Sequence, residues 1–231
     1  MKKTILIPCY NEKDTILKVI NRVKSNISDG DNIIIIDDCS NDGTKEILKS
    51  INDFQIKIIF AKKNQGKGSA VQLGLKEKNL NEIIIIQDAD LEYNPKDFSK
   101  LLIPFFEANA DVVYGSRFLG SSDFVRIHFF WHYIANKILT FFCNVFTNLN
   151  MTDMETGYKA FKSSVIRDIN LKENSFGIEP EITIKLAKKK YKFFEVPISY
   201  AGRSYEEGKK IQFKDAISAI FCIVKYGIFS K

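Results

Sequence analysis

The chain has 231 residues, of which 45% are hydrophobic and 27% charged, so it holds enough apolar material for one sizeable core. A net charge of +6 suits phosphate-bearing substrates, an anionic membrane surface or nucleic acid, and does not choose among them. The four cysteines are widely spaced and no signal peptide is expected, which argues against a secreted disulfide-rich protein and favours reduced thiols in the cytoplasm. No apolar run reaches the ~18 residues of a membrane span, which argues against an integral membrane protein.

The first half of the chain alternates short aliphatic strands with helices. Strands are expected at 4–7, 33–36, 56–60 and 83–86, and helices around 16–23, 45–51 and 70–76. A half-exposed strand would alternate apolar and polar residues, whereas these strands are nearly continuous isoleucine. The pattern therefore predicts an α/β fold with a parallel sheet covered by helices on both faces.

Carboxylates directly follow two of these strands. Asp37 and Asp38 follow the second strand, and Asp88 and Asp90 follow the fourth. Residues two apart in an extended chain point the same way, so Asp88 and Asp90 can face one spot beyond the sheet, where ligands bind in open α/β folds. Such oxygen donors suit Mg²⁺ or Mn²⁺ carrying a substrate phosphate. The alternative is turn and helix-cap chemistry, which explains one pair more easily than two.

A glycine-bearing loop with the sequence NQGKGS, at 64–69, precedes the third helix. It is not a P-loop, because it lacks the glycine and lysine spacing of that motif. Lys67 or the backbone N–H groups can still lie near a phosphate. An ordinary connecting loop is an equal alternative.

Three blocks now resemble the signature of family 2 glycosyltransferases with the GT-A fold. They read PCYNE at 8–12, DDCSNDGT at 37–44 and QDADL at 87–91. The likeness is closest to the dolichol-phosphate mannose synthase branch, whose members transfer a sugar from a nucleotide to a polyprenyl phosphate. The resemblance implies one GT-A domain over 1–231, with a mixed, mainly parallel sheet. Its parts would be a nucleotide-binding half (1–120), an acceptor-binding half (121–211) and an amphipathic C-terminal helix (212–231).

The resemblance also implies roles for individual residues. Asp88 and Asp90 would bind Mg²⁺ or Mn²⁺ bridging the donor diphosphate. Residues expected to contact the nucleotide-sugar donor are Pro8, Tyr10, Glu12, Asp37, Asp38, Lys67, Asp88, Ala89, Arg203 and Lys210. The residues expected to act in the chemical step are Asp90, Arg117 and Asp153.

The second half begins with a helix expected over 97–107 and a strand over 111–114. Arg117 follows that strand and offers a planar donor fork suited to phosphate. The resemblance places this arginine beside the donor diphosphate or the acceptor phosphate. A surface ion pair is the alternative.

The segment 124–149 is rich in aromatic residues, but its charged and polar residues argue against a membrane span. His128, His132, Asn136 and Lys137 share one helical face. We interpret the segment as a helix at the membrane interface, with its polar stripe toward the site and the two histidines binding the acceptor phosphate. The alternatives are a core helix or the face of a homodimer; a zinc site lacks a third ligand.

The block at 153–161, DMETGYKAF, resembles another family block. Family members that act on sugar hydroxyls use a carboxylate near this position as general base. A phosphate acceptor is already anionic, so Asp153 is expected to orient the substrate; a helix or turn cap is the alternative. Glu179 and Glu181 begin a helix over 182–189, where a structural role is at least as reasonable as a role in the site.

The last strand is expected at 193–200, and a polar loop follows over 201–211. Such a loop can close over a site. Arg203 and Lys210 resemble the basic residues that meet the donor diphosphate, with Lys209 as the alternative to Lys210. The tail at 213–229 is amphipathic and predicts a helix lying on a surface or membrane.

We therefore expect an inverting, metal-dependent hexosyltransferase that moves a sugar from GDP-mannose or a UDP-hexose to polyprenyl or dolichyl phosphate. It would be a peripheral protein on the cytoplasmic face of the membrane. The first alternative changes the acceptor to diacylglycerol or a glycan hydroxyl. The second is a non-catalytic module that binds nucleotide sugars. Nucleic acid is not an expected partner, because no recognised binding module is present.

Overall fold

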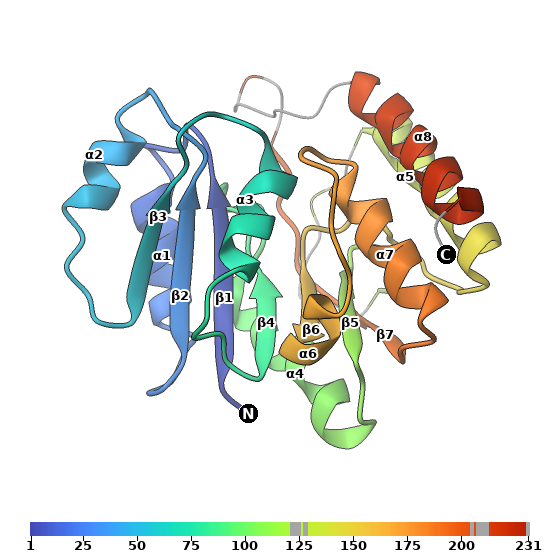
Figure 1. The fold of residues 1–231 in the computed structure, drawn as a ribbon, viewed down its shortest axis with the longest axis horizontal. Helices are drawn as coiled ribbons and strands as arrows, with labels where there is room; N and C mark the ends of the chain where they lie inside the picture. Colours follow the sequence, from blue (N-terminus) through green and yellow to red (C-terminus); the bar gives the residue numbers. More distant parts are fainter. Residues whose placement is uncertain (121–125, 127–128, 204–205, 207–212, 230–231) are drawn as a thin grey trace.

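The computed structural model describes residues 1–120, 126, 129–203, 206 and 213–229. Seven strands form one sheet in the order β3-β2-β1-β4-β6-β5-β7 (Figure 1). The strands are β1 (Lys3–Cys9), β2 (Asn32–Asp37), β3 (Ile56–Phe60), β4 (Ile83–Ile86), β5 (Val112–Ser116), β6 (Lys159–Lys162) and β7 (Phe193–Pro197). Strands β1 to β4 are mutually parallel, β6 is antiparallel to β4 and β5, and β7 is parallel to β5. The expected mixed, mainly parallel sheet is thus confirmed.

Strand β6 was not anticipated from the sequence. Its residues, KAFK, contain no aliphatic run, and its first residue, Lys159, is fully buried. The ammonium group of Lys159 is paired with the Glu179 carboxylate and hydrogen-bonded to the Thr156 carbonyl, which offsets the cost of burying a charge. A lysine in a central strand is therefore permitted by a partner that lies 20 residues further along the chain.

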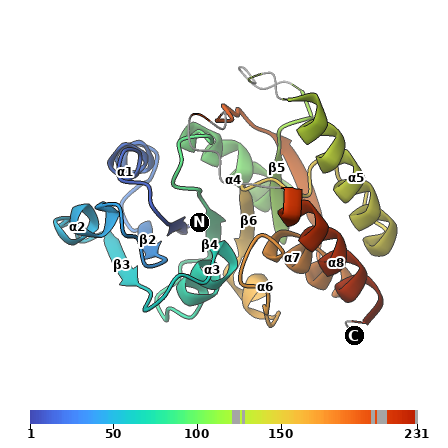
Figure 2. The same cartoon turned by 90° about the horizontal axis from the view of Figure 1, so that it is seen from above.

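Helices cover both faces of the sheet. They are α1 (Ile16–Lys24), α2 (Thr44–Lys49), α3 (Lys67–Leu75), α4 (Phe98–Glu107), α5 (Phe130–Thr147), α6 (Ser163–Arg167), α7 (Ile178–Lys188) and α8 (Phe213–Phe229). A short 3-10 helix, Pro95–Asp97, precedes α4. Helices α1, α2 and α4 lie on one side of the sheet, and α3, α5, α6, α7 and α8 on the other (Figure 2). Alternate residues of the isoleucine strands belong to the two separate cores formed with these two sets of helices. Burial on both faces explains why these strands do not alternate.

Helices α5 and α8 pack against each other at one end of the molecule, beside α7 (Figures 1 and 2). Both present large apolar side chains to solvent. Those at least 40% exposed are Phe130, Trp131, Tyr133, Ile138, Phe141, Phe142 and Val145 on α5, and Ile217, Ile220, Phe221, Ile228 and Phe229 on α8. We call this set the apolar helix face. None of the helices in the described part of the chain has the length and hydropathy needed to cross a bilayer.

Candidate functional site

The loops that follow β1, β2 and β4 meet at one edge of the sheet, because these strands are parallel and in register. Each loop contains one non-glycine residue in the left-handed backbone region. These residues are Asn11 (φ 50°), Cys39 (φ 63°) and Leu91 (φ 66°). Such conformations are uncommon outside glycine and gather at functional sites. The edge of the sheet where acidic residues were expected to meet therefore also carries unusual backbone geometry.

Asp38 is tied to the turn that opens α3. Its carboxylate accepts hydrogen bonds from the backbone N–H groups of Gln65 at 3.1 Å and Gly66 at 2.6 Å. Asp37 is fully buried and accepts a longer hydrogen bond, 3.3 Å, from the backbone N–H of Ser40. The two carboxylates expected to hold a nucleoside thus brace the loops around the site.

Lys67, in the same turn, lies between two carboxylates from distant parts of the chain. Its ammonium nitrogen is 2.8 Å from Oδ1 of Asp88 and 3.0 Å from Oε1 of Glu179. Glu179 also pairs with buried Lys159, so four charges alternate in sign from the sheet edge into the core. The sequence indicated that Lys67 can lie near a phosphate, with an ordinary loop as an equal alternative. It did not single out Glu179 as a partner, because their contact arises only in the folded chain, where the start of α7 lies near the start of α3.

Arg203 enters a second group of carboxylates. Its Nη2 atom lies 3.2 Å from both Asp90 and Glu12, and its Nε atom lies 3.5 Å from Glu92. Burial, with the neighbouring charges of Glu92 and Asp88, raises the pKa of Asp90 to about 8. The arginine therefore only partly balances the negative charge collected here. Glu92, which the sequence analysis did not single out, accepts hydrogen bonds from the Tyr200 hydroxyl at 2.5 Å and the Arg203 backbone N–H at 2.8 Å.

The remaining donor-site candidates lie in the same loops. Thr15 donates from its hydroxyl to the Ala89 carbonyl at 2.8 Å and lies 2.7 Å from a Glu12 oxygen, so it joins the loop after β1 to the loop after β4. Ala89 is buried, Tyr10 is half-buried, and Pro8 belongs to β1. Lys210 lies outside the described residues.

The acidic loop after β4 suits a hard divalent cation. Asp88 and Asp90 offer oxygen ligands, and burial together with the charges of Glu92 and Asp88 raises the pKa of Asp90, so a bound cation would favour its ionised form. A side chain at Gly157 would overlap the Asp88 carboxylate, so glycine leaves that carboxylate its space. No cluster of three or more His, Cys, Asp or Glu suited to a metal occurs among the described residues. A cation held here would take much of its shell from phosphate and water, as Mg²⁺ commonly does.

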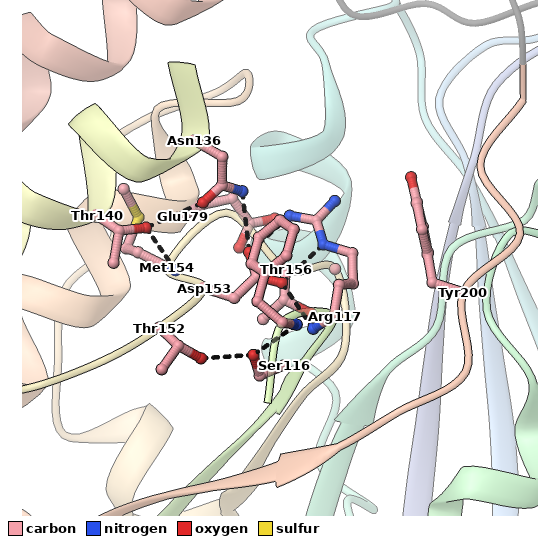
Figure 3. Close-up of polar contacts among 12 residues, drawn as sticks. Ser116, Arg117, Asn136, Thr140, Thr152, Asp153, Met154, Thr156, Glu179 and Tyr200 are labelled. Carbon is pink, nitrogen blue, oxygen red and sulfur yellow. Dashed lines mark hydrogen bonds and ion pairs between the residues drawn. The ribbon is translucent and has the colours of Figure 1, made fainter. Parts of the chain in front are cut away.

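Arg117 and Asp153 form a buried, two-pronged ion pair (Figure 3). Arg117 donates from Nε to Oδ2 and from Nη2 to Oδ1, both at 2.7 Å, and its backbone N–H donates to Oδ2 at 3.0 Å. Asn136 adds a donor at 2.9 Å. Burial alone would raise the pKa of Asp153, but the charge and hydrogen bonds of Arg117 hold that pKa below its ordinary value. The pair is therefore not a surface ion pair, and Asp153 is poorly suited to accept a proton.

The polar stripe of α5 faces the loop that carries Asp153. Besides Asn136, the Thr140 hydroxyl accepts from the Met154 backbone N–H at 3.1 Å (Figure 3). Lys137 donates to the Thr152 carbonyl at 3.2 Å. His132 lies in the first turn of α5, half-buried, with its ring 5.6 Å from that of Phe129. His128 lies outside the described residues. Among the described residues of the α5 polar stripe, Asn136 hydrogen-bonds directly to Asp153.

Glu155 is a further carboxylate that the sequence analysis passed over. Burial and the charge of Glu179 raise its pKa to about 7. Within the described part of the chain its buried Oε1 atom has no hydrogen-bond partner. Its position two residues after Asp153 is the only sequence signal that pointed to it.

Comparison with known proteins identifies relatives along most of the chain. The family described as Glycosyl transferase family 2 matches residues 4–169. Glycosyltransferase AglJ of Haloferax volcanii is 29% identical over 201 residues, which cover 86% of this chain and 63% of that protein. The undecaprenyl-phosphate mannosyltransferase of Micrococcus luteus is 26% identical, covering 90% and 87% of the two chains. A UDP-N-acetylglucosamine–dolichyl-phosphate N-acetylglucosaminyltransferase of Methanococcus voltae is 28% identical, covering 96% of each.

The fold resembles that of solved glycosyltransferases. Glucosyl-3-phosphoglycerate synthase of Mycobacterium tuberculosis, solved with Mn²⁺, uridine diphosphate and phosphoglyceric acid, superposes with a TM-score of 0.73. The alignment covers all of this chain and 80% of that one, at 16% identity. At that identity the likeness concerns the fold alone, which is the expected GT-A arrangement.

Proposed function

The chain belongs to glycosyl transferase family 2, and from this premise we propose that it transfers a sugar from a nucleotide donor to a polyprenyl phosphate. The proposal treats the chain as one domain, with a nucleotide-binding half at residues 1–120 and an acceptor-binding half at residues 121–211, from which Arg203 and Lys210 also reach the donor. The observation that carries it is the linked set of charges at the carboxyl edge of the sheet. Asp38 and Asp88 are joined through Lys67 and its turn, and Asp90, two residues after Asp88 in the same loop, pairs with Arg203.

In this proposal Asp88 and Asp90 hold Mg²⁺ or Mn²⁺. The cation would supply charge neutralisation for the nucleoside diphosphate that leaves. Arg203, whose guanidinium already lies beside Asp90, would meet the same diphosphate, together with Lys210. Pro8, Tyr10, Glu12, Asp37, Asp38 and Ala89 would line the nucleoside end.

The acceptor side favours an anionic nucleophile. A phosphate acceptor attacks without losing a proton, whereas a hydroxyl acceptor needs a general base. Asp153 accepts four hydrogen bonds, three of them from Arg117, so it is better placed to orient an acceptor than to deprotonate one. Direct attack by the acceptor phosphate on the donor sugar would invert the anomeric centre. His128 and His132 remain candidate contacts of the acceptor.

A donor and acceptor screen tests this function. Purified protein is incubated with Mn²⁺, labelled GDP-mannose, UDP-glucose or UDP-N-acetylglucosamine, and either undecaprenyl phosphate, dolichyl phosphate or diacylglycerol. We expect label in a lipid extract only with a polyprenyl phosphate, and only with one or two of the donors. Transfer to diacylglycerol alone would contradict the acceptor assignment. Tight donor binding with neither hydrolysis nor transfer would instead favour the non-catalytic alternative.

We also propose that the apolar helix face rests on the cytoplasmic surface of a membrane, because the protein would reach a lipid-linked acceptor at that surface. Trp131 is the only tryptophan and is 76% exposed on this face, so its fluorescence reports the contact directly. With vesicles of phosphatidylglycerol and phosphatidylcholine we expect its emission to shift to shorter wavelength and the protein to sediment with lipid.

A matched pair of variants tests the location of that membrane contact. Phe221→Asp places a charge on the apolar helix face and should weaken vesicle binding by at least about tenfold. Phe54 is even more exposed, at 95%, but it lies between β2 and β3, away from the apolar helix face. The Phe54→Asp variant should therefore bind vesicles like the unmodified protein. Equal binding by both variants would show that lipid meets another surface.

A further inference from the structure

We propose that Glu173 is a positioning residue for the donor site: by bonding to α8 it holds the segment 173–175 against the turn that presents Lys67 to Asp88. The inference rests on the proposed function, because it takes the acidic edge of the sheet to be where the donor nucleotide binds. Glu173 lies outside every family block in the sequence, and nothing in its local sequence marks it. Its importance follows from the contacts at its two ends.

The side chain of Glu173 is bound to α8. Its Oε1 atom accepts hydrogen bonds from the Lys225 ammonium at 2.7 Å and from the Tyr226 hydroxyl at 2.6 Å. Tyr226 is only 4% exposed, so its hydroxyl depends on a partner within the protein. Close packing continues at Gly177, where an added side chain would come within 2.6 Å of the Cys222 sulfur. The segment that contains Glu173 is therefore fitted closely to α8.

The backbone of the same segment is bound to the start of α3. The Glu173 carbonyl accepts from the Gln72 side chain at 2.9 Å, and the Asn174 carbonyl accepts from the Ser69 N–H at 2.9 Å. A side chain at Gly68 would overlap the Glu173 carbonyl, and one at Gly66 would come within 2.7 Å of the Asn174 carbonyl. This contact explains the glycine on each side of Lys67, because only glycine lets the segment approach so closely.

The opposite side of this turn forms the candidate site. Gln65 and Gly66 donate their backbone N–H groups to Asp38, and Lys67 pairs with Asp88. A displacement of the segment 173–175 would therefore move donors of Asp38 and the cation of Asp88 together. One carboxylate oxygen of Glu173, bound to donors on α8, thus helps to fix the geometry of Asp38 and Asp88.

The fold is expected to survive loss of the Glu173 side chain. Glu181 accepts hydrogen bonds from the backbone N–H groups of Lys172 and Glu173 at 2.8–3.0 Å, so the segment keeps a second anchor. The experiment compares Glu173→Ala with Glu173→Gln. Lys225 and Tyr226 both donate to one oxygen of Glu173, and the glutamine carbonyl supplies such an oxygen without the charge.

Nucleotide binding is measured by calorimetry, with UDP and GDP each in the presence of Mn²⁺. Glu173→Ala should weaken the affinity for the preferred nucleotide by roughly 3- to 30-fold, while Glu173→Gln should retain most of it. Tyr226→Phe, which removes one donor from the α8 side, should weaken it in the same direction. Glu77→Ala is the matched control: Glu77 pairs with Lys57 at the other end of α3, and its loss should leave affinity unchanged.

Each outcome decides the proposal. A folded Glu173→Ala protein that binds nucleotide as the unmodified protein does would overturn the positioning role and leave the proposed function standing. The alanine and glutamine variants could instead lose affinity equally, in proportion to a lowered unfolding midpoint. That result would show that Glu173 contributes only to stability, and it would also overturn the positioning role. If the unmodified protein binds neither UDP nor GDP, the proposed function and this inference fall together.

Discussion

Asp90→Ala is expected to lower the rate of sugar transfer by at least about 10²–10³-fold and to leave the protein folded. Asp90 is one of the two carboxylates proposed to hold the cation, and the cation would carry the charge of the departing diphosphate. Arg203 keeps Glu12 and Glu92 as partners after the change, so no buried cation is abandoned. Burial and the neighbouring charges of Glu92 and Asp88 raise the pKa of Asp90 to about 8, so its ionised form is disfavoured in the folded protein and its removal is not expected to destabilise the fold.

The measurement pairs a Mn²⁺-dependent transfer assay with thermal unfolding of the same preparations. Asp111→Ala is the control. Asp111 is a partly exposed carboxylate just before β5, at the opposite end of that strand from Arg117, and it forms an ion pair with Lys162. The Asp111 variant should keep nearly full activity. An Asp90 variant with near-normal turnover would remove Asp90 from the proposed chemistry.

The sheet could be predicted from the sequence because its central strands carry their own signal. Runs such as Ile83–Ile86 are apolar on both faces, and burial on both faces is what the structure shows. Strand β6 lacked that signal, because Lys159 is neutralised by Glu179 and not by a neighbour in sequence. The aromatic segment was expected to be helical over 124–149, and its described helix begins at Phe130.

The site was predictable only in part, for a related physical reason. Which carboxylates lie at the sheet edge follows from where each strand ends, and this is visible in the sequence. Which cation each carboxylate meets depends on packing: Lys67 meets Asp88 and Glu179, and Arg203 meets Glu12 from 191 residues away. For the same reason Glu92 and Glu173 were not anticipated, since their partners come from the last quarter of the chain.

Asp153→Ala should have the largest effect on stability, lowering the free energy of unfolding by about 3–5 kcal/mol. The change leaves the Arg117 side chain, which is only 13% exposed, without its two-pronged partner, and an unpaired charge in such a place costs far more than the intact pair contributes. Chemical denaturation of the variant and the unmodified protein measures this difference. The double variant Arg117→Met, Asp153→Leu, which removes both charges, should recover most of the lost stability but not the activity.

The pH dependence of the difference in unfolding free energy tests the ion pair between Arg117 and Asp153. The pKa of Asp153 is lower in the folded protein than its ordinary value of 3.8, so the folded state favours the ionised form. Its contribution should be fully present above about pH 4 and be lost as the pH falls through the lower, folded-state pKa. A difference between Asp153→Asn and the unmodified protein that is constant from pH 5 to 8 would agree with a permanently ionised, orienting carboxylate. A carboxylate that gains a proton during turnover would instead make kcat of the unmodified protein fall as Asp153 is protonated at low pH. Loss of that pH dependence in Asp153→Asn would assign Asp153 the role of base and reopen the case for a hydroxyl acceptor.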